Sequence, residues 1–290
     1  MISAFAPVTL RIARSANPVG DASVDLTACR VHSAGMNFDI SHLLESWEYQ
    51  PGQVVVRKFV GKDGVEKIQL RVDLGLLQMN AHGRPDGKRP NGHPSLFDYH
   101  LHRLKQHQEK QGSEEGFVLK PEDIAKLQLE ALQYHHRYIC LLQLEDYAGV
   151  VRDTERNLRL FEFVCEHTES EELGWALQQF RPQVLMLRAR ARATQKLMAD
   201  DYPAAIAEID RAIEELREFY TESSRPEWAE QSAEIQSLQN WLEEINNKRP
   251  LSKREQLEID LTEAVKREDY EKAAKVRDAL RKLESSSHNS

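Results

Sequence analysis

Apolar residues recur at helical spacing through much of the chain. In one stretch the spacings alternate between three and four residues over about five turns, at Ile124, Leu127, Ala131, Tyr134, Tyr138 and Leu141. Pro121 lies where this helix would begin, and proline fits the first turn of a helix because its missing N–H is not needed there. We also expect a long helix over residues 173–198, bent at Pro182, and another over residues 228–245. The pattern predicts a mainly α fold.

A different period marks the N-terminal part. Apolar and polar side chains alternate over residues 68–74, which predicts a β-strand. A second strand is expected over residues 54–60, and residues 61–64 would form the turn of a β-hairpin. Residues 41–49 predict a short helix. Two strands do not fold alone, so we expect a helix or another copy to cover the apolar face of the hairpin.

Two helix–helix corners share a short motif. Residues 145–148, EDYA, and residues 200–203, DDYP, lie 55 residues apart, and each places acidic residues and a tyrosine between two predicted helices. We expect Asp146, Asp200 and Asp201 to cap the helices that follow, since carboxylates accept from free backbone N–H groups. The second unit resembles a tetratricopeptide repeat in its small and aromatic residues, Ala189, Tyr202, Ala205 and Ala212. The regular spacing of about 34 residues that such arrays have is absent.

The C-terminal part predicts a helical hairpin. Two apolar stripes flank the polar turn 267–269; they consist of Leu257, Leu261, Ala264 and Val265 and of Ala273, Val276, Leu280 and Leu283. We expect Asp269 to cap the second helix and Tyr270 to pack into the corner. The small residues Ala273 and Ala274 let the helices approach closely. Each apolar face is too narrow to make a core alone, so it must be buried against the rest of the chain, a second copy or a partner protein.

This hairpin resembles the UVR motif, which is found near the C-terminus of UvrB, within UvrC of the bacterial excinuclease, and in adaptor and activator proteins of the Clp protease system. The resemblance lies in the pattern aromatic-Glu-x-Ala-Ala-x-x-Arg-Asp over residues 270–278, with Tyr270 where Phe is usual. In the excinuclease the motif joins one subunit to the other, so the resemblance implies a bacterial protein with a protein-binding hairpin. The expected docking residues are Tyr270, Glu271, Ala273, Ala274, Val276, Arg277, Asp278 and Leu280.

Composition fits a helix-rich protein. Of 290 residues, 30% are charged, and the mean hydropathy is -0.61. Cys29, Cys140 and Cys165 are odd in number and far apart, which favours reduced thiols in the cytoplasm over a disulfide framework or a metal site. No apolar run approaches the length of a membrane span, so we expect a soluble protein with no membrane contact.

Linkers and composition divide the chain into four expected segments. These are a disordered segment 1–35, a small α+β segment 36–111 with the β-hairpin and a basic loop, a helical repeat-like domain 117–248, and the UVR-like hairpin 251–285. Pro250 and Ser252 mark a hinge and a helix cap before the last segment.

Net charge is -8, but one segment is basic. Residues 53–110 carry 11 Lys and Arg against 6 Asp and Glu, whereas residues 251–290 carry 9 of each. Basic side chains in the first of these segments could contact the phosphates of a nucleic acid. The candidate contacts are Arg57, Lys58, Lys62, Lys67, Arg84, Lys88 and Arg89.

Catalytic signatures are missing. The chain has no Gly-x-Ser-x-Gly, His-Glu-x-x-His or Cys-x-x-Cys motif and no dinucleotide fingerprint. Histidines are dense over residues 93–107, but His100 and His102 point about 200° apart on a helix, and a helical metal site would use an i, i+4 pair. We therefore expect no enzyme activity, no metal and no cofactor.

Two functions fit these observations. The first is an interaction scaffold or adaptor that docks a partner protein, such as another UVR-motif protein or a second copy, through the C-terminal hairpin. The alternative is an accessory protein of DNA excision repair or stress response, in which the basic residues of 53–110 contact DNA and the hairpin recruits other proteins.

Overall fold

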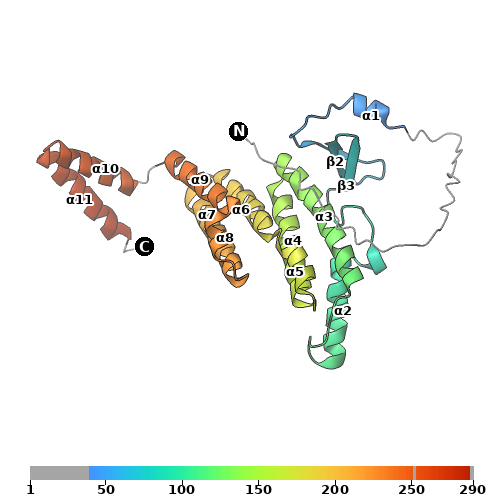
Figure 1. Ribbon diagram of the computed structural model, residues 1–290. Helices are drawn as coiled ribbons and strands as arrows, with labels where there is room; N and C mark the ends of the chain where they lie inside the picture. Colours follow the sequence, from blue (N-terminus) through green and yellow to red (C-terminus); the bar gives the residue numbers. More distant parts are fainter. Residues whose placement is uncertain (1–38, 251–252, 288–290) are drawn as a thin grey trace, which may run out of the picture. The chain divides into compact units, whose positions relative to one another are not determined.

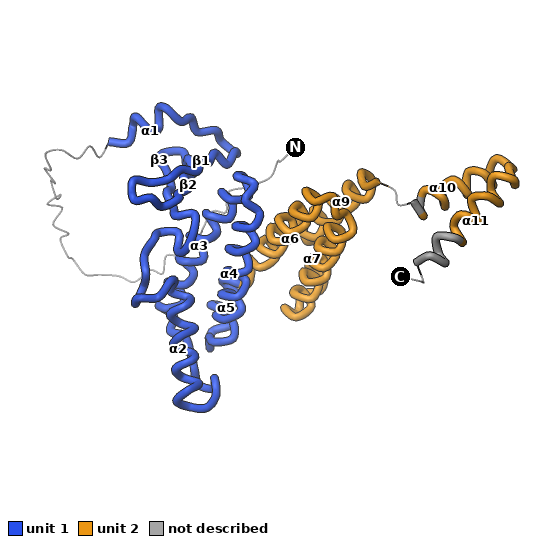
Figure 2. The backbone as a smooth tube through the Cα atoms, turned by 180° about the vertical axis from the view of Figure 1, so that it is seen from behind, with its two compact units in different colours: residues 1–177 blue, residues 178–290 orange. Residues whose placement is uncertain are grey.

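The computed structural model describes residues 39–250 and 253–287, and the expectations for residues 1–35 and for Ser252 lie outside this part. The fold is mainly α, with helical hairpins, a small antiparallel sheet near the N-terminal end and a C-terminal helix pair (Figure 1). This confirms the predicted fold class. The chain forms two compact units, residues 1–177 and 178–290, which Figure 2 shows in two colours.

The sheet has three strands where the sequence predicted two. Its elements, preceded by the short helix α1 (Ser41–Glu45), are β1 (Val55–Val60), β2 (Glu66–Val72) and β3 (Gly75–Asn80). They pair in the order β1-β2-β3, and both pairs are antiparallel. The third strand escaped prediction because it has no alternation of apolar and polar residues and little β-branching. Leu74, expected in a strand, lies in the turn before β3 and is 88% exposed.

Both faces of β2 are covered, which the expected alternation did not anticipate. Ile68 is fully buried on one face, and β2 contacts helix α3 (Pro121–Gln143). Gln69 and Arg71 are polar and were expected in solvent, yet each is only 8% exposed. The segment before β1 contacts Arg71, whose Nε donates to the backbone oxygen of Trp47 over 2.8 Å, whereas Gln69 bonds to Arg57 of β1 and Gln78 of β3. Arg71 is held there by a backbone acceptor, so its burial is tolerated.

Four further helices complete the first unit: α2 (Leu96–Gln111), α3, α4 (Tyr147–Glu166) and α5 (Glu171–Gln178). Ser95 caps α2, because its hydroxyl accepts from the backbone N–H of Asp98. Helices α3 and α4 pack along each other as an antiparallel pair (Figure 1). Leu127 and Leu141 from α3 and Val150 and Leu160 from α4 are fully buried. They make the helical core of this unit.

The second unit begins with α6 (Arg181–Leu197), α7 (Tyr202–Glu222), α8 (Glu227–Gln231) and α9 (Ala233–Lys248). Alanines let α6 and α7 pack closely: Ala191 and Ala205 are fully buried. The single bent helix expected over residues 173–198 was wrong, because α5 ends at Gln178 and α6 begins at Arg181. Pro182 lies in the first turn of α6, where its missing N–H costs nothing, so it starts a helix and does not bend one.

The last elements are α10 (Lys253–Lys266) and α11 (Tyr270–Ser287), which form the predicted C-terminal helical hairpin. Asp269 caps α11 as expected: its side chain accepts from the backbone N–H of Lys272 over 3.0 Å. The side chain of Leu283 lies outside the described residues.

Three helix–helix corners have the same backbone geometry. A residue with left-handed φ of 56° to 59° precedes the capping aspartate in each, at Glu145, Asp200 and Glu268. The aspartates that follow cap the next helix through their side chains and are Asp146, Asp201 and Asp269. The motif similarity in the sequence therefore corresponds to one repeated turn, in which the capping residue also donates its N–H to the helix just ended. Asp200 is the left-handed residue of its corner and not a cap, which corrects the expectation.

Candidate functional site

The seam of the C-terminal hairpin is narrow. Ala264 of α10 is 2% exposed and Ala273 of α11 is 8% exposed, and no other described side chain of the pair is buried to this degree. Two alanines bring the helix axes close but remove little apolar area from water. Ala273, which was expected to contact a partner, therefore lies inside the hairpin.

Apolar side chains beside this seam are left partly uncovered. Tyr270 is 70% exposed, Val265 is 52% exposed and Ile259 is 41% exposed. Half-buried apolar residues extend this surface. They are Leu257, Leu261, Ala274, Val276, Ala279 and Leu280. Tyr270 does not pack into the corner as expected, because the turn projects it from the first position of α11. We call the set Val265, Tyr270 and these half-buried residues the hairpin's apolar face.

Charged residues surround the apolar face and pair locally. Glu271 accepts from Lys275 over 2.8 Å, and Arg277 lies 3.7 Å from Asp278. All four side chains are more than half exposed. Such pairs are exchanged easily for contacts with a partner, because exposed ion pairs contribute only about 0–1 kcal/mol.

The basic residues proposed for nucleic-acid contact are largely engaged within the first unit. Lys58 pairs with Glu66 over 3.0 Å, and Lys67 pairs with Asp63 over 2.6 Å. Arg57 donates to the Gln69 side chain over 2.7 Å and stacks on the Trp47 ring.

The basic loop between β3 and α2 contributes the remaining candidates of that set. Arg84 pairs with Glu130 over 2.8 Å and with Asp86 over 2.9 Å. Lys62 and Lys88 are exposed, and Arg89 reaches the backbone oxygen of Gly92 over 3.5 Å. Of the seven candidates, Lys58, Lys67 and Arg84 are therefore paired with acidic neighbours.

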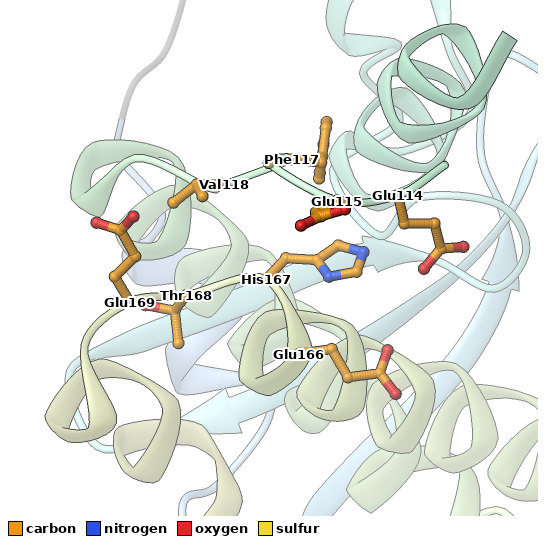
Figure 3. A pocket seen from close by; sticks show the side chains of 9 residues that line it. Glu114, Glu115, Phe117, Val118, Glu166, His167, Thr168 and Glu169 are labelled. Atoms are coloured by element: carbon orange, nitrogen blue, oxygen red, sulfur yellow. The ribbon is translucent and has the colours of Figure 1, made fainter. Parts of the chain in front are cut away.

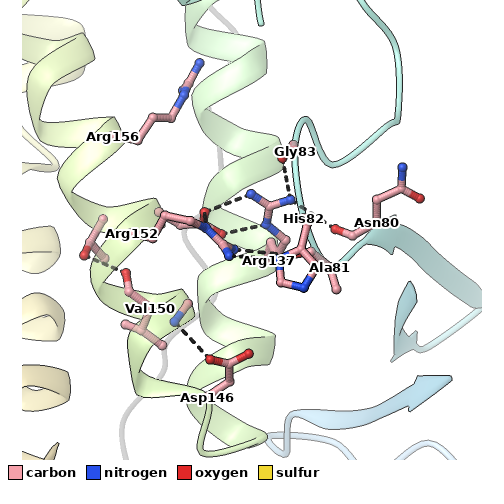
Figure 4. Close-up of polar contacts among 12 residues, drawn as sticks. Asn80, Ala81, His82, Gly83, Arg137, Asp146, Val150, Arg152 and Arg156 are labelled. Atoms are coloured by element: carbon pink, nitrogen blue, oxygen red, sulfur yellow. Dashed lines mark hydrogen bonds and ion pairs between the residues drawn. The ribbon is translucent and has the colours of Figure 1, made fainter. Parts of the chain in front are cut away.

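Sequence inspection missed a buried polar network that ties the basic loop to α3 and α4. Arg137 donates to both carboxylate oxygens of Asp153, over 2.6 and 2.8 Å, and to the backbone oxygens of Asn80 and Gly83 (Figure 4). Arg152 donates to Asp153 over 2.9 Å. The helical spacing of apolar residues does not predict these contacts, because a buried ion pair depends on which residues the fold brings together.

Glu130 forms the second half of this network. Its fully buried carboxylate accepts from the backbone N–H groups of Leu96 and Phe97, over 2.7 and 3.1 Å, and also from Arg84 and Arg156. The free N–H groups at the start of α2 are thus satisfied by a side chain of α3. Burial lowers the pKa of the Arg156 guanidinium, against the attraction of Glu130. We interpret this network as structural, because every strong acceptor in it is occupied.

The buried cysteine Cys140 is unreactive, and the described residues hold no cluster of metal ligands. Burial raises the pKa of the Cys140 thiol to about 12, so this thiol stays protonated and unreactive. No group of three or more potential ligands for a metal ion occurs within residues 39–250 and 253–287. None of the helices in the described part is long and apolar enough to cross a membrane.

Comparison with known protein families identifies one motif in the chain. The family model described as "UvrB/uvrC motif" matches residues 252–286, which span the hairpin of α10 and α11. No curated protein and no solved structure matches the chain. The UVR motif predicted from the pattern of residues 270–278 is thereby confirmed, and it includes the exposed apolar side chains of Val265 and Tyr270.

Proposed function

We propose that this protein is a non-enzymatic adaptor that binds another protein through the apolar face of its C-terminal hairpin. The partner is a second helical hairpin of the UvrB/uvrC type, on another protein or on a second copy of this chain. The proposal sets the protein in the cytoplasm, where Cys140 and Cys165 remain free thiols.

The observation that carries the proposal is the exposure of Val265 and Tyr270 beside a seam whose buried side chains, among the described residues, are Ala264 and Ala273. Fully burying a large apolar side chain contributes about 1.5–3 kcal/mol, so covering several half-buried residues and this tyrosine could support a specific complex. A helix pair that presents such a face fits the grooves of another helix pair. The balanced charge of residues 251–290 argues against phosphate binding by this hairpin.

The remaining helices suit the role of a scaffold. The α6–α7 and α3–α4 pairs have buried cores, and the αL-Asp-Tyr corner recurs in both units. This architecture supports the tetratricopeptide-like interpretation, in which helix pairs supply rigid surfaces and not catalytic groups.

The test compares partners captured by the full chain and by a chain that ends at Arg249, after cross-linking in cells. Two point variants sharpen it: Val265→Asp adds a charge to the apolar face, and Thr262→Asp adds the same charge at an exposed polar position of α10. We expect the truncation and Val265→Asp to lose a hairpin-bearing partner that Thr262→Asp keeps. Recovery of the same partners by the full and the truncated chain would overturn the proposal.

A further inference from the structure

The sheet of the first unit has a free edge. Strand β1 is the outermost strand on one side, because the strands pair in the order β1-β2-β3. The backbone of such a strand has no second neighbour and can accept one further strand. On the other side of the sheet, the N–H of Asn80 at the end of β3 already donates to the oxygen of Pro85 in the basic loop, over 2.8 Å. The edge of β1 is therefore the better place for a strand to add.

The hairpin turn shows which backbone groups of β1 point away from β2. The N–H of Gly61 donates to the oxygen of Val65 over 2.8 Å, so these two residues form a hydrogen-bonded pair. In antiparallel strands such pairs alternate with positions whose backbone groups point outward. The register of β1 and β2 then makes Val56, Lys58 and Val60 the outward positions. In the described part of the chain, no partner is found for their outward N–H and C=O groups.

A hollow of about 320 Å³ opens beside the first residues of β1. Its lining includes Val54 and Val56 and, from the end of α3, Gln143 and Leu144. The side chain of Val56 lies on the same face of the sheet as that of the fully buried Ile68. A strand added beside β1 places every second side chain on this face, so the hollow has room for one of its apolar side chains.

A larger hollow of about 500 Å³ lies between the α2–α3 loop and the end of α4 (Figure 3). Its lining includes four glutamates, and no strand contributes to it. Exposed carboxylates alone do not select a ligand. The smaller hollow differs because it borders a row of free backbone groups.

On the other face of β1, Arg57 is a cation without a carboxylate partner among the described residues. Its Nε donates to the side chain of Gln69 over 2.7 Å, and its guanidinium lies 4.3 Å from the centre of the Trp47 ring. These contacts orient the guanidinium and leave its two terminal nitrogens available. Side chains directly opposite each other on paired strands have Cβ atoms about 4.5–5.5 Å apart, so a carboxylate opposite Arg57 would reach it.

A second copy of β1 fits this edge poorly. In the two antiparallel registers that overlap two β1 strands most fully, either Arg57 or Lys58 lies directly opposite its own copy. Like charges in this position are unfavourable. Charge complementarity therefore favours an acidic segment from another protein.

We propose that the free edge of β1 binds an extended segment of a partner protein as an antiparallel strand, with an acidic residue opposite Arg57 and an apolar residue on each side of it. The outward backbone groups of Val56, Lys58 and Val60 supply hydrogen bonds that do not depend on the partner's sequence. Arg57 and the hollow beside Val56 select the side chains.

The experiment measures binding of a dye-labelled peptide, Ser-Thr-Val-Glu-Val-Thr-Ser with blocked ends, to the full chain by fluorescence anisotropy. Its pattern places Glu opposite Arg57. N-methylation of the two Val residues removes the N–H groups that face β1, whereas N-methylation of Glu and the second Thr removes N–H groups that face solvent. We expect saturable binding, its loss in the first derivative and its retention in the second. Equal binding of the two derivatives, or no saturation at millimolar concentration, would overturn the proposal.

Variants locate the contacts on the protein. Lys58→Pro removes an outward N–H that β2 does not use and should abolish binding, whereas Lys58→Ala keeps this N–H and should bind. Equal binding by these two variants would contradict strand addition. The N-methylated peptides test the same hydrogen bonds without any change to the protein.

The charge contact has its own pair of variants. Arg57→Gln should weaken binding of the peptide about tenfold, because a charge-assisted contact is lost. Lys105→Gln removes an exposed charge from α2 and should leave binding unchanged. A peptide with Gln in place of Glu should bind Arg57→Gln and the unchanged protein equally. An equal loss in Arg57→Gln and Lys105→Gln would refute a specific contact.

Hydrogen exchange shows whether the edge is free before the peptide binds. The amides of Val56, Lys58 and Val60 should exchange rapidly in the full chain alone and slowly with the peptide. Slow exchange without the peptide would mean that the protein itself or a second copy covers the edge, and would overturn the proposal. These outcomes do not depend on the C-terminal hairpin, which lies in the other unit.

Discussion

Arg137 and Asp153 form a two-pronged ion pair in the interior of the first unit, with both side chains 1% exposed. Arg137 lies on α3 and Asp153 on α4, and Arg137 also donates to backbone oxygens at the end of β3 and in the loop that follows it. One guanidinium therefore joins three segments of the chain that are distant in sequence. The sheet, the basic loop and the helix pair are held together by this contact.

Asp153→Asn should destabilise the protein strongly. The change leaves the buried charge of Arg137 without its counterion, which typically costs about 3–5 kcal/mol. Glu271→Gln removes a carboxylate from an exposed pair with Lys275 and should cost at most about 1 kcal/mol. Urea unfolding of both variants measures the two values. Similar small losses in both would show that the interior pair does not hold the unit together.

Asp200→Gly should stabilise the second unit. Asp200 has a φ of 56°, a left-handed conformation that glycine adopts without steric cost, so the gain should be about 0.5–1 kcal/mol. Ala199→Gly in the same turn is the matched control and should lower stability, because its φ is not positive and glycine only adds freedom to the unfolded chain. The comparison uses thermal unfolding of both variants. A gain in the control or a loss in Asp200→Gly would contradict the corner geometry.

Stability should fall as the pH drops below about 6.5. Burial lowers the pKa of the His135 imidazole to about 4, with a further contribution from neighbouring His136. Below pH 6.5 the unfolded chain takes up a proton at His135 that the folded chain does not, so the unfolded state gains stability until the pH reaches about 4. The same direction holds for His100, whose pKa is lowered by burial.

Denaturant titrations between pH 7.5 and 4.5 measure the loss in the free energy of unfolding. His135 should account for about 2 kcal/mol of this loss. His135→Gln should remove this share of the loss, since glutamine does not titrate, and should leave the share that comes from His100. An unchanged loss in this variant would mean that His135 is charged in the folded protein as readily as in the unfolded chain.

The sequence predicted elements whose period is strong and local. The apolar stripe from Ile124 to Leu141 predicted helix α3. The caps at Asp146 and Asp269 could also be predicted, because each side chain accepts from a backbone N–H of the helix that directly follows it. Strand β3 was missed because its pairing depends on β2 and not on its own pattern. Pro182 was placed inside a helix because a proline that starts a helix and one that bends it have the same local sequence.

Candidate sites were predicted less well, for a physical reason. The motif of residues 270–278 is a local pattern, so sequence was sufficient to find it. Whether Tyr270 is buried or exposed depends on how the turn directs it, and the prediction was wrong there. The partners of Glu130 come together only when distant segments of the chain meet, and no spacing in the sequence predicts them.

Site-specific photo-cross-linking in living cells tests the central claim most directly. A photoreactive phenylalanine analogue replaces Tyr270 in the full chain, and the control carries it at Lys272, an exposed position about 200° around α11 from Tyr270. We predict that position 270 cross-links to a second helical hairpin, on another protein or another copy, and that position 272 does not. Cross-links from position 270 that lead only to other parts of the same molecule would contradict the account, because the apolar face would then be covered by the protein itself.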